Sequence, residues 1–170
     1  VMLYEDVLID SDAMHFKDLY ARTSHMMGSL LFKLDENDKA FKAWNKALGL
    51  AQEMNDMFLH ASLLCDISES AIMLNAIRTA RSANEQCLTH AQHLRQKELI
   101  GRCLVNNASL QYEHAQFVKA ERTLRKVHKI SRHLGNLRLT LKSVALMARC
   151  YANPDNEQHD FKRAGVLFER

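Results

Sequence analysis

A constant spacing of forty residues between small side chains is the feature that most constrains how this chain can fold. Three small residues recur at this interval, and three alanines follow them twelve positions later: Gly28, Ser68 and Ala108, then Ala40, Ala80 and Ala120. Small residues at fixed places let two helices cross closely, whereas larger side chains would push them apart. A constant period of this length predicts a stack of similar units, a solenoid, because no single unit can bury its apolar faces alone.

The composition predicts an all-α fold. One proline and five glycines in 170 residues are too few for the turns of a β-sandwich or an α/β domain of this length. Apolar residues recur at three- and four-residue steps, which is the period of an amphipathic helix. We expect Asp38 to be an N-cap and Gly135 to end a helix. The helices predicted after the first break cover 13–34, 40–54, 57–74, 80–94, 99–113, 118–133, 137–151 and 160–170.

The order Gly28, Ala40, Trp44, Ala47 resembles the tetratricopeptide repeat family, in the forty-residue variant found in Pins-type adaptors, kinesin light chains and MalT-type regulators. The resemblance covers essentially the whole chain. It implies a right-handed α-α superhelix of about four helical hairpins, with Trp44 in the seam to the next hairpin. Other helical repeats and a simple bundle are the alternative folds. The single array of 1–170 would comprise the end of an earlier unit at 1–11, full units at 12–56, 57–96 and 97–136, and an interrupted unit at 137–170.

The same resemblance implies a concave groove lined by the first helix of each hairpin. Arg22, Arg102 and Lys142 hold equivalent positions there, and such a cationic row could bind carboxylates of an acidic peptide. Asn106 resembles the asparagines that grip a peptide backbone in kinesin light chains, or else it bridges two hairpins. The groove positions are Arg22, His25, Ser29, Lys33, Ser62, Cys65, Glu69, Met73, Arg102, Val105, Ser109, Tyr112, Glu113, Lys142 and Arg149.

Charge is distributed unevenly along the chain. Residues 1–90 carry 8 Lys/Arg against 13 Asp/Glu, a net −5, and residues 91–142 carry 11 against 3, a net +8. The two regions could attract each other between molecules, which predicts electrostatic self-association. The helix at 118–133 also carries a basic outer stripe, which is either a solvated face or an RNA-binding surface without the usual aromatic residues. The stripe consists of Arg122, Arg125, Lys126, Lys129 and Arg132.

No motif in the sequence predicts catalysis, a cofactor or a metal site. The chain contains no HExxH motif, no glycine-rich phosphate loop and no CxxC pair. Cys65, Cys87, Cys103 and Cys150 lie in apolar helical context, so we expect four reduced thiols and an intracellular protein, cytoplasmic in preference to nuclear. No apolar run is long enough for a membrane span. The acidic start is not typical of a signal peptide, and a start at Val1 suggests part of a longer protein.

These observations favour a non-catalytic scaffold that binds a peptide or helix of another protein within an assembly. A regulatory domain that senses a small ligand or a signalling peptide is the alternative function. RNA binding through the basic stripe is a weaker alternative, and nucleic acid is not the expected partner.

Overall fold

The protein is described by a computed structural model, which describes residues 17–157 and 160–168. The predicted end of an earlier unit, 1–11, lies outside the described residues. Within the described ranges every regular element is an α-helix, and none of these helices is long and apolar enough to cross a membrane. The helices are α2 (Lys17–Lys33), α3 (Asn37–Glu53), α4 (Met57–Met73), α5 (Ile77–His93), α6 (Lys97–Glu113), α7 (Phe117–Leu134), α8 (Leu137–Ala152) and α9 (Phe161–Phe168).

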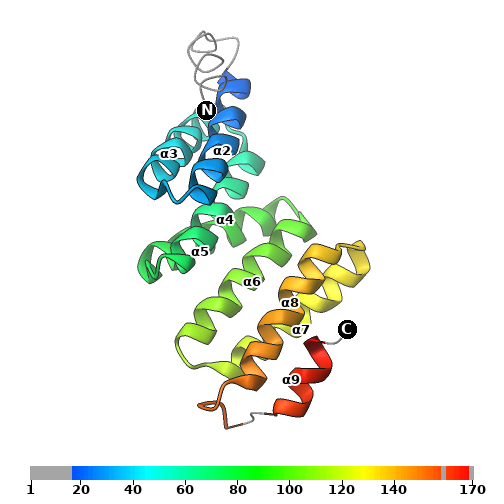
Figure 1. Cartoon of the computed structure of the whole chain (residues 1–170). Helices are drawn as coiled ribbons and strands as arrows, with labels where there is room; N and C mark the ends of the chain where they lie inside the picture. Colours follow the sequence, from blue (N-terminus) through cyan, green and yellow to red (C-terminus); the bar gives the residue numbers. More distant parts are fainter. Residues whose placement is uncertain (1–16, 158–159, 169–170) are drawn as a thin grey trace.

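Consecutive helices pack as hairpins, and the hairpins stack along one direction (Figure 1). The pairs are α2 with α3, α4 with α5, α6 with α7, and α8 with α9. The first helices of successive pairs also touch, since α4 contacts both α2 and α6, and α6 contacts α8. The prediction of an all-α array of hairpins is therefore confirmed.

A left-handed residue at each of the six junctions from α2 to α8 accounts for the forty-residue period. Six residues, twenty positions apart, have φ between 54° and 64°, and each follows a helix of similar length. A left-handed residue reverses the chain within a connection of two or three residues, so two helices and two connections repeat every forty residues. Gly135 is the glycine among the six, which confirms the predicted C-cap. The six residues are Asp35, Asn55, Asn75, Arg95, Ala115 and Gly135.

These short connections also correct three predicted boundaries. The helix expected at 40–54, with Asp38 as its N-cap, begins at Asn37, and its N-cap residue is Glu36, whose side chain makes no cap hydrogen bond. The prediction for Asp38 is therefore wrong. The helices expected at 80 and 99 begin at Ile77 and Lys97. Ile77 is followed by polar Arg78 and Thr79, and α6 begins with polar Lys97 and Glu98, so apolar periodicity detects both helices late.

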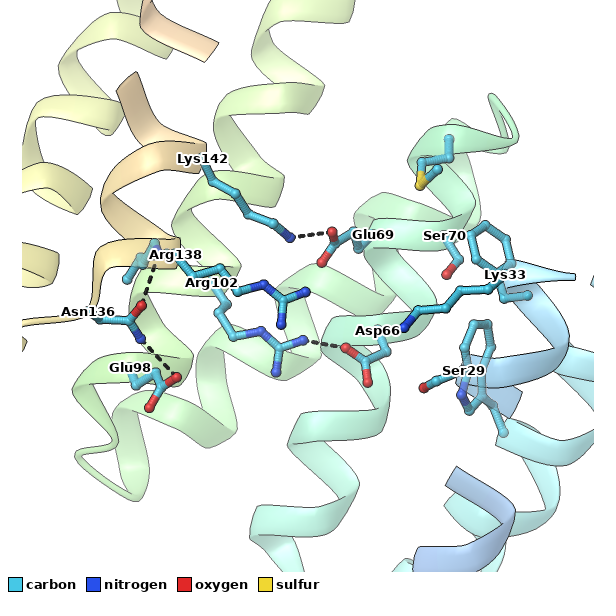
Figure 2. A pocket seen from close by; sticks show the side chains of 14 residues that line it. Ser29, Lys33, Asp66, Glu69, Ser70, Glu98, Arg102, Asn136, Arg138 and Lys142 are labelled. Carbon is cyan, nitrogen blue, oxygen red and sulfur yellow. Dashed lines mark hydrogen bonds and ion pairs between the residues drawn. The ribbon is translucent and has the colours of Figure 1, made fainter. Parts of the chain in front are cut away.

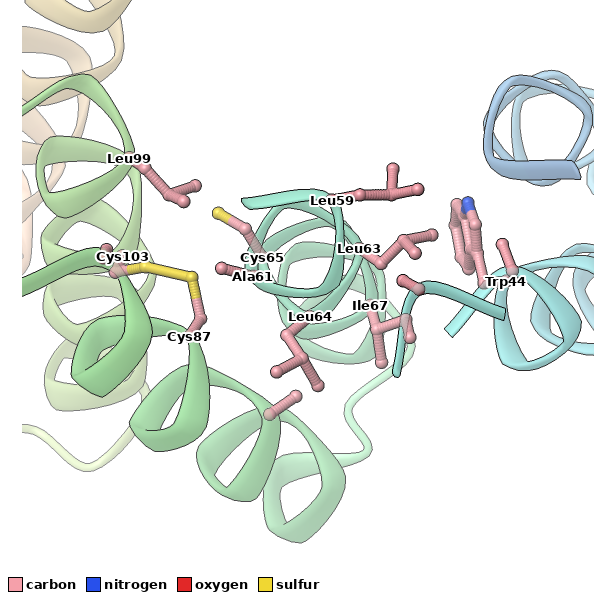
Figure 3. Close-up of a cluster of buried hydrophobic side chains, with 14 of the residues drawn as sticks. Trp44, Leu59, Ala61, Leu63, Leu64, Cys65, Ile67, Cys87, Leu99 and Cys103 are labelled. Carbon is pink, nitrogen blue, oxygen red and sulfur yellow. A yellow bond between two sulfur atoms is a disulfide. The ribbon is translucent and has the colours of Figure 1, made fainter. Parts of the chain in front are cut away.

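The close helix crossing inferred from small residues is present in the first hairpin. A Cβ added to Gly28 would lie 2.5 Å from Cδ1 of Trp44, so only glycine leaves room for the indole. Trp44 is buried, and its Nε1 donates to the backbone carbonyl of His25 at 3.2 Å. Leu59 and Leu63 of α4 face the same ring (Figure 3), which confirms that Trp44 fills the seam to the next hairpin.

The second hairpin achieves the same approach with a serine. Ser68 and Ala80 are fully buried, and the Ser68 hydroxyl donates to the Ala80 carbonyl at 2.9 Å. This bond satisfies the buried hydroxyl, which would otherwise be costly in the interior. The register of small residues therefore marks real helix contacts in both units.

Candidate functional site

The first helices of the hairpins line a groove with a volume of about 500 Å³. Side chains from α2, α4, α6 and α8 reach into it, because these helices lie side by side along the stack (Figure 1). Both apolar groups, such as Phe32 and Leu139, and charged groups line it. The labelled polar lining in Figure 2 consists of Ser29, Lys33, Asp66, Glu69, Ser70, Glu98, Arg102, Asn136, Arg138 and Lys142.

Asp66 is the ionic centre of this groove. His25 Nε2 of α2 lies 2.6 Å from its carboxylate, and Arg102 of α6 pairs with its other oxygen. Burial alone would raise the pKa of Asp66, but the hydrogen bonds and charges of His25 and Arg102 hold that pKa below its usual range. One carboxylate on α4 thus connects the first helices of three successive hairpins.

A second ion pair spans the groove. Lys142 of α8 pairs with Glu69 of α4, two hairpins away along the chain (Figure 2). Arg22 pairs with Asp18 in its own helix and with Asp56 at the start of α4. Each cation of the predicted row therefore already has a carboxylate partner within the protein. An acidic ligand that used this row would have to displace or share those partners.

Two further cations in the groove have no such partner. Among the described residues, no ion pair involves Lys33 or Arg138, and both side chains point into the groove (Figure 2). The lining contains four cations, Lys33, Arg102, Arg138 and Lys142, against three carboxylates, Asp66, Glu69 and Glu98. Glu98 accepts a hydrogen bond from Asn136 Nδ2 at 3.0 Å. The groove therefore presents a local excess of positive charge, which attracts anionic groups.

A smaller hollow of about 290 Å³ continues along α4, α6 and α8. Its lining includes Tyr112, whose hydroxyl accepts from Asn153 Nδ2 at 3.1 Å. The guanidinium carbon of Arg149 lies 4.8 Å from the centre of the Tyr112 ring. Glu69 and Lys142 line both hollows, so the two form one polar surface along the first helices.

The predicted groove residues fall into three groups. Arg22, His25 and Ser62 line neither hollow. Asn106 is largely buried at the wall of the smaller hollow, and its Nδ2 donates to the Cys65 carbonyl at 3.1 Å, which is a bridge between hairpins. Cys65 was expected in the groove, which is wrong, because it is fully buried. The predicted residues that line one or both hollows are Ser29, Lys33, Glu69, Met73, Arg102, Val105, Asn106, Ser109, Tyr112, Glu113, Lys142 and Arg149.

Sequence reasoning did not find Asp66 and Arg138. Asp66 follows Cys65 directly. The predicted register was shifted by one residue here, so it placed the buried Cys65 thiol in the groove and omitted the Asp66 carboxylate. Arg138 stands forty residues after Glu98, and both are charged residues in the first turn of a first helix. This recurrence of a charged residue after forty positions is the sequence signal that could have identified Arg138.

The basic outer stripe lies apart from both hollows. Its five residues are exposed on α7, a second helix, and line neither hollow. Arg125 is engaged by Glu121 and by the Tyr151 hydroxyl. Groove and stripe can therefore be changed separately in experiments.

Three cysteines that are distant in sequence meet in the core. Cys87 of α5 and Cys103 of α6 are joined as a disulfide, so the expectation of four reduced thiols is wrong for this pair. The sulfurs of Cys65, Cys87 and Cys103 all lie within 4.8 Å of one another. Burial raises the pKa of the Cys65 thiol to about 12. The three cysteines are 22 and 16 residues apart in the sequence. Only the packing of consecutive hairpins brings them together, so no local motif predicts the cluster.

A stack of helical hairpins with a groove along its first helices defines a class, the tetratricopeptide-like α-solenoids, and this chain has that fold. One solved structure that it resembles is BtubC (BKLC) from P. vanneervenii. The TM-score is 0.80 at 16% sequence identity, over 99% of this chain and 69% of that chain. At this identity the similarity establishes the fold. A search of family models and a search of curated proteins each returned no match to the sequence.

Proposed function

We propose that this chain is a non-catalytic interaction scaffold that binds an extended acidic segment of a partner protein in the groove between α2, α4, α6 and α8. The observation that carries the proposal is the cationic excess of the groove, with Lys33 and Arg138 outside the described ion pairs. Solenoids of this fold generally act as interaction scaffolds, which is consistent with this function.

The arrangement suits an extended peptide with carboxylates better than a single compact anion. Lys33 lies at the end of α2 and Arg138 at the start of α8, on opposite sides of the Asp66 and Glu69 pairs. Two acidic side chains of one peptide could pair with these cations, while apolar side chains contact Phe32 and Leu139. Charge-assisted hydrogen bonds of this kind are stronger than neutral ones.

The test is a binding selection from extended peptides of equal length that differ in acidic content, followed by affinity measurement of the selected peptide. We expect acidic peptides to be selected and the Lys33→Glu/Arg138→Glu double variant to bind at least about tenfold more weakly. Affinity should also fall as salt rises, because the cations remain partly solvated. Lys129→Glu/Arg132→Glu is the matched control, since it makes the same charge change on α7.

Other functions predict other outcomes of the same experiment. RNA binding or self-association through the basic stripe would be impaired by the α7 control variant and not by the groove variant. A sensor for a small ligand would show no preference among peptides but a shift in melting temperature with that ligand. Equal peptide affinity in the wild type and the groove variant would contradict the proposed function.

A further inference from the structure

The three-cysteine cluster lies where two hairpins meet. Cys65 comes from α4, Cys87 from α5 and Cys103 from α6, and each is 0% exposed. Figure 3 shows the Cys87–Cys103 bond beside the Cys65 sulfur, with Leu64 and Leu99 close by. Three cysteine sulfurs, which are soft metal ligands, therefore lie together at one fully buried position between three helices.

Packing alone does not require sulfur at these places. The other hairpins have apolar, small or polar residues at equivalent positions, forty residues before or after each cysteine, and they pack in the same fold. Cysteine is a small apolar residue that could serve as filler at one such place. Three at one point form a complete thiol donor set. The equivalents are Ala47 and Val127 for Cys87, Leu63 and Ser143 for Cys103, and His25 and Val105 for Cys65.

We propose that Cys65, Cys87 and Cys103, once the disulfide is reduced, bind one Cu(I) ion in a three-coordinate thiolate site. Thiolates select soft metals, with Cu(I) and zinc foremost. Zinc takes four ligands in structural sites. Among the described residues, the group of metal-ligating side chains contains these three cysteines and no histidine or carboxylate. Three sulfur donors without a fourth ligand match Cu(I).

Burial disfavours a thiolate at Cys65, and two polar groups beside the cluster partly offset that effect. Asn106 Nδ2 lies 3.8 Å from Cys65 Sγ and can donate to it. The Arg102 guanidinium favours negative charge at Cys65, although its ion-pair partner Asp66 acts in the opposite direction. Such outer groups orient ligands and tune a bound metal. The leucine shell excludes water, which keeps Cu(I) from contact with oxygenated solvent.

Metal binding and the disulfide exclude each other. A phosphine reductant and one water convert the disulfide into two thiols, and the phosphine leaves as its oxide. Cu(I) then displaces one proton from each of three thiols, and the three protons pass to solvent. The oxidised protein has one free thiol in the cluster, so it cannot provide the three thiolate ligands of the site.

The test is anaerobic titration of the phosphine-reduced protein with a Cu(I) complex, followed by ultraviolet thiolate-to-copper absorption and X-ray absorption at the copper edge. We expect one copper per chain, a first shell of three sulfurs, and no tight binding to the oxidised protein. Cys65→Ser should weaken binding by at least about tenfold, because loss of a ligand costs no less than loss of an outer-shell partner. Cys150→Ser is the matched control, since Cys150 is also buried but lies outside the cluster.

Two results would overturn the proposal. One is a copper shell with fewer than three sulfurs in the reduced wild type, a measurement that needs no variant to fold. The other is equal copper affinity in folded Cys65→Ser and Cys150→Ser proteins. If circular dichroism shows that Cys65→Ser does not fold, Cys103→Ser provides the second test.

Discussion

Gly28 is the residue on which the best-preserved hairpin depends. A Cβ at this position would lie 2.5 Å from the Trp44 ring, and that ring is wedged between Phe32 and Phe41. The indole therefore cannot move aside without disturbing its aromatic neighbours. A minimal change of one methyl group tests this packing directly.

We predict that Gly28→Ala destabilises the protein by about 1–3 kcal/mol, the usual cost of overpacking. Gly49→Ala is the control, since an added Cβ there meets nothing within 4 Å and the residue lies exposed inside α3. That control should stabilise by about 0.5–1 kcal/mol through helix propensity. Chemical denaturation measures both, and equal stabilisation by both variants would show that Trp44 does not fill this space.

Ala115 is a second residue with a testable strain. Its φ of 56° lies in the left-handed region, which costs a residue with a Cβ roughly 1–2 kcal/mol. We predict that Ala115→Gly raises the free energy of unfolding by about 1 kcal/mol, with part of the gain lost to the freer unfolded chain. Gly135→Ala, at the next junction, should lower it by a similar amount. A destabilised Ala115→Gly protein would contradict the proposed junction geometry.

At the scale of helices, α4 and α5 are linked by an edge-to-face contact between two histidines. The His60 and His90 rings lie edge to face with centroids 5.2 Å apart. Burial, and then the nearby His90, lower the pKa of His60 below its usual value of 6.5. The unfolded chain therefore binds a proton more readily than the folded one as pH falls below that value.

This difference predicts a loss of stability in mild acid. The contribution of His60 is constant well above pH 6.5 and declines as pH falls through the unfolded and then the folded pKa. His60→Gln should reduce the drop in melting temperature between about pH 7.5 and about pH 5.5. The exposed His93→Gln is the control. An unchanged drop in His60→Gln would exclude this residue as the cause.

The helices and their pairing could be predicted from the sequence, because small residues at Gly28, Ser68 and Ala108 mark the crossings. The first turns at Ile77 and Lys97 could not, because they carry no apolar period. The left-handed conformations of Arg95 and Ala115 could not be predicted either, since neither residue type favours that conformation.

At the scale of the whole molecule, the groove was predictable in place but not in detail. The resemblance to tetratricopeptide repeats placed Lys33, Arg102 and Lys142 along the first helices, and all three line the larger hollow. The partners of Arg102 and Lys142, which are Asp66 and Glu69, depend on distances across hairpins that no local pattern encodes. The cysteine cluster has the same origin, because three helices from two hairpins create it.

The ion pairs also bear on the shape of the solenoid. Asp66 joins α2, α4 and α6, and the Lys142 pair joins α4 to α8. These contacts lie on the groove side of the stack, where they hold neighbouring first helices together. Partly exposed pairs contribute little to stability one by one, but they position the cations that an acidic partner would meet.

The most direct test of the groove as the binding surface is to locate the bound peptide. The selected acidic peptide would carry a photoreactive group, and mass spectrometry would identify the residues it labels. The groove proposal predicts labels on α2, α4, α6 and α8 near Lys33 and Arg138, lost in the Lys33→Glu/Arg138→Glu variant. Labels concentrated on the α7 stripe near Lys129, unchanged in that variant, would contradict it.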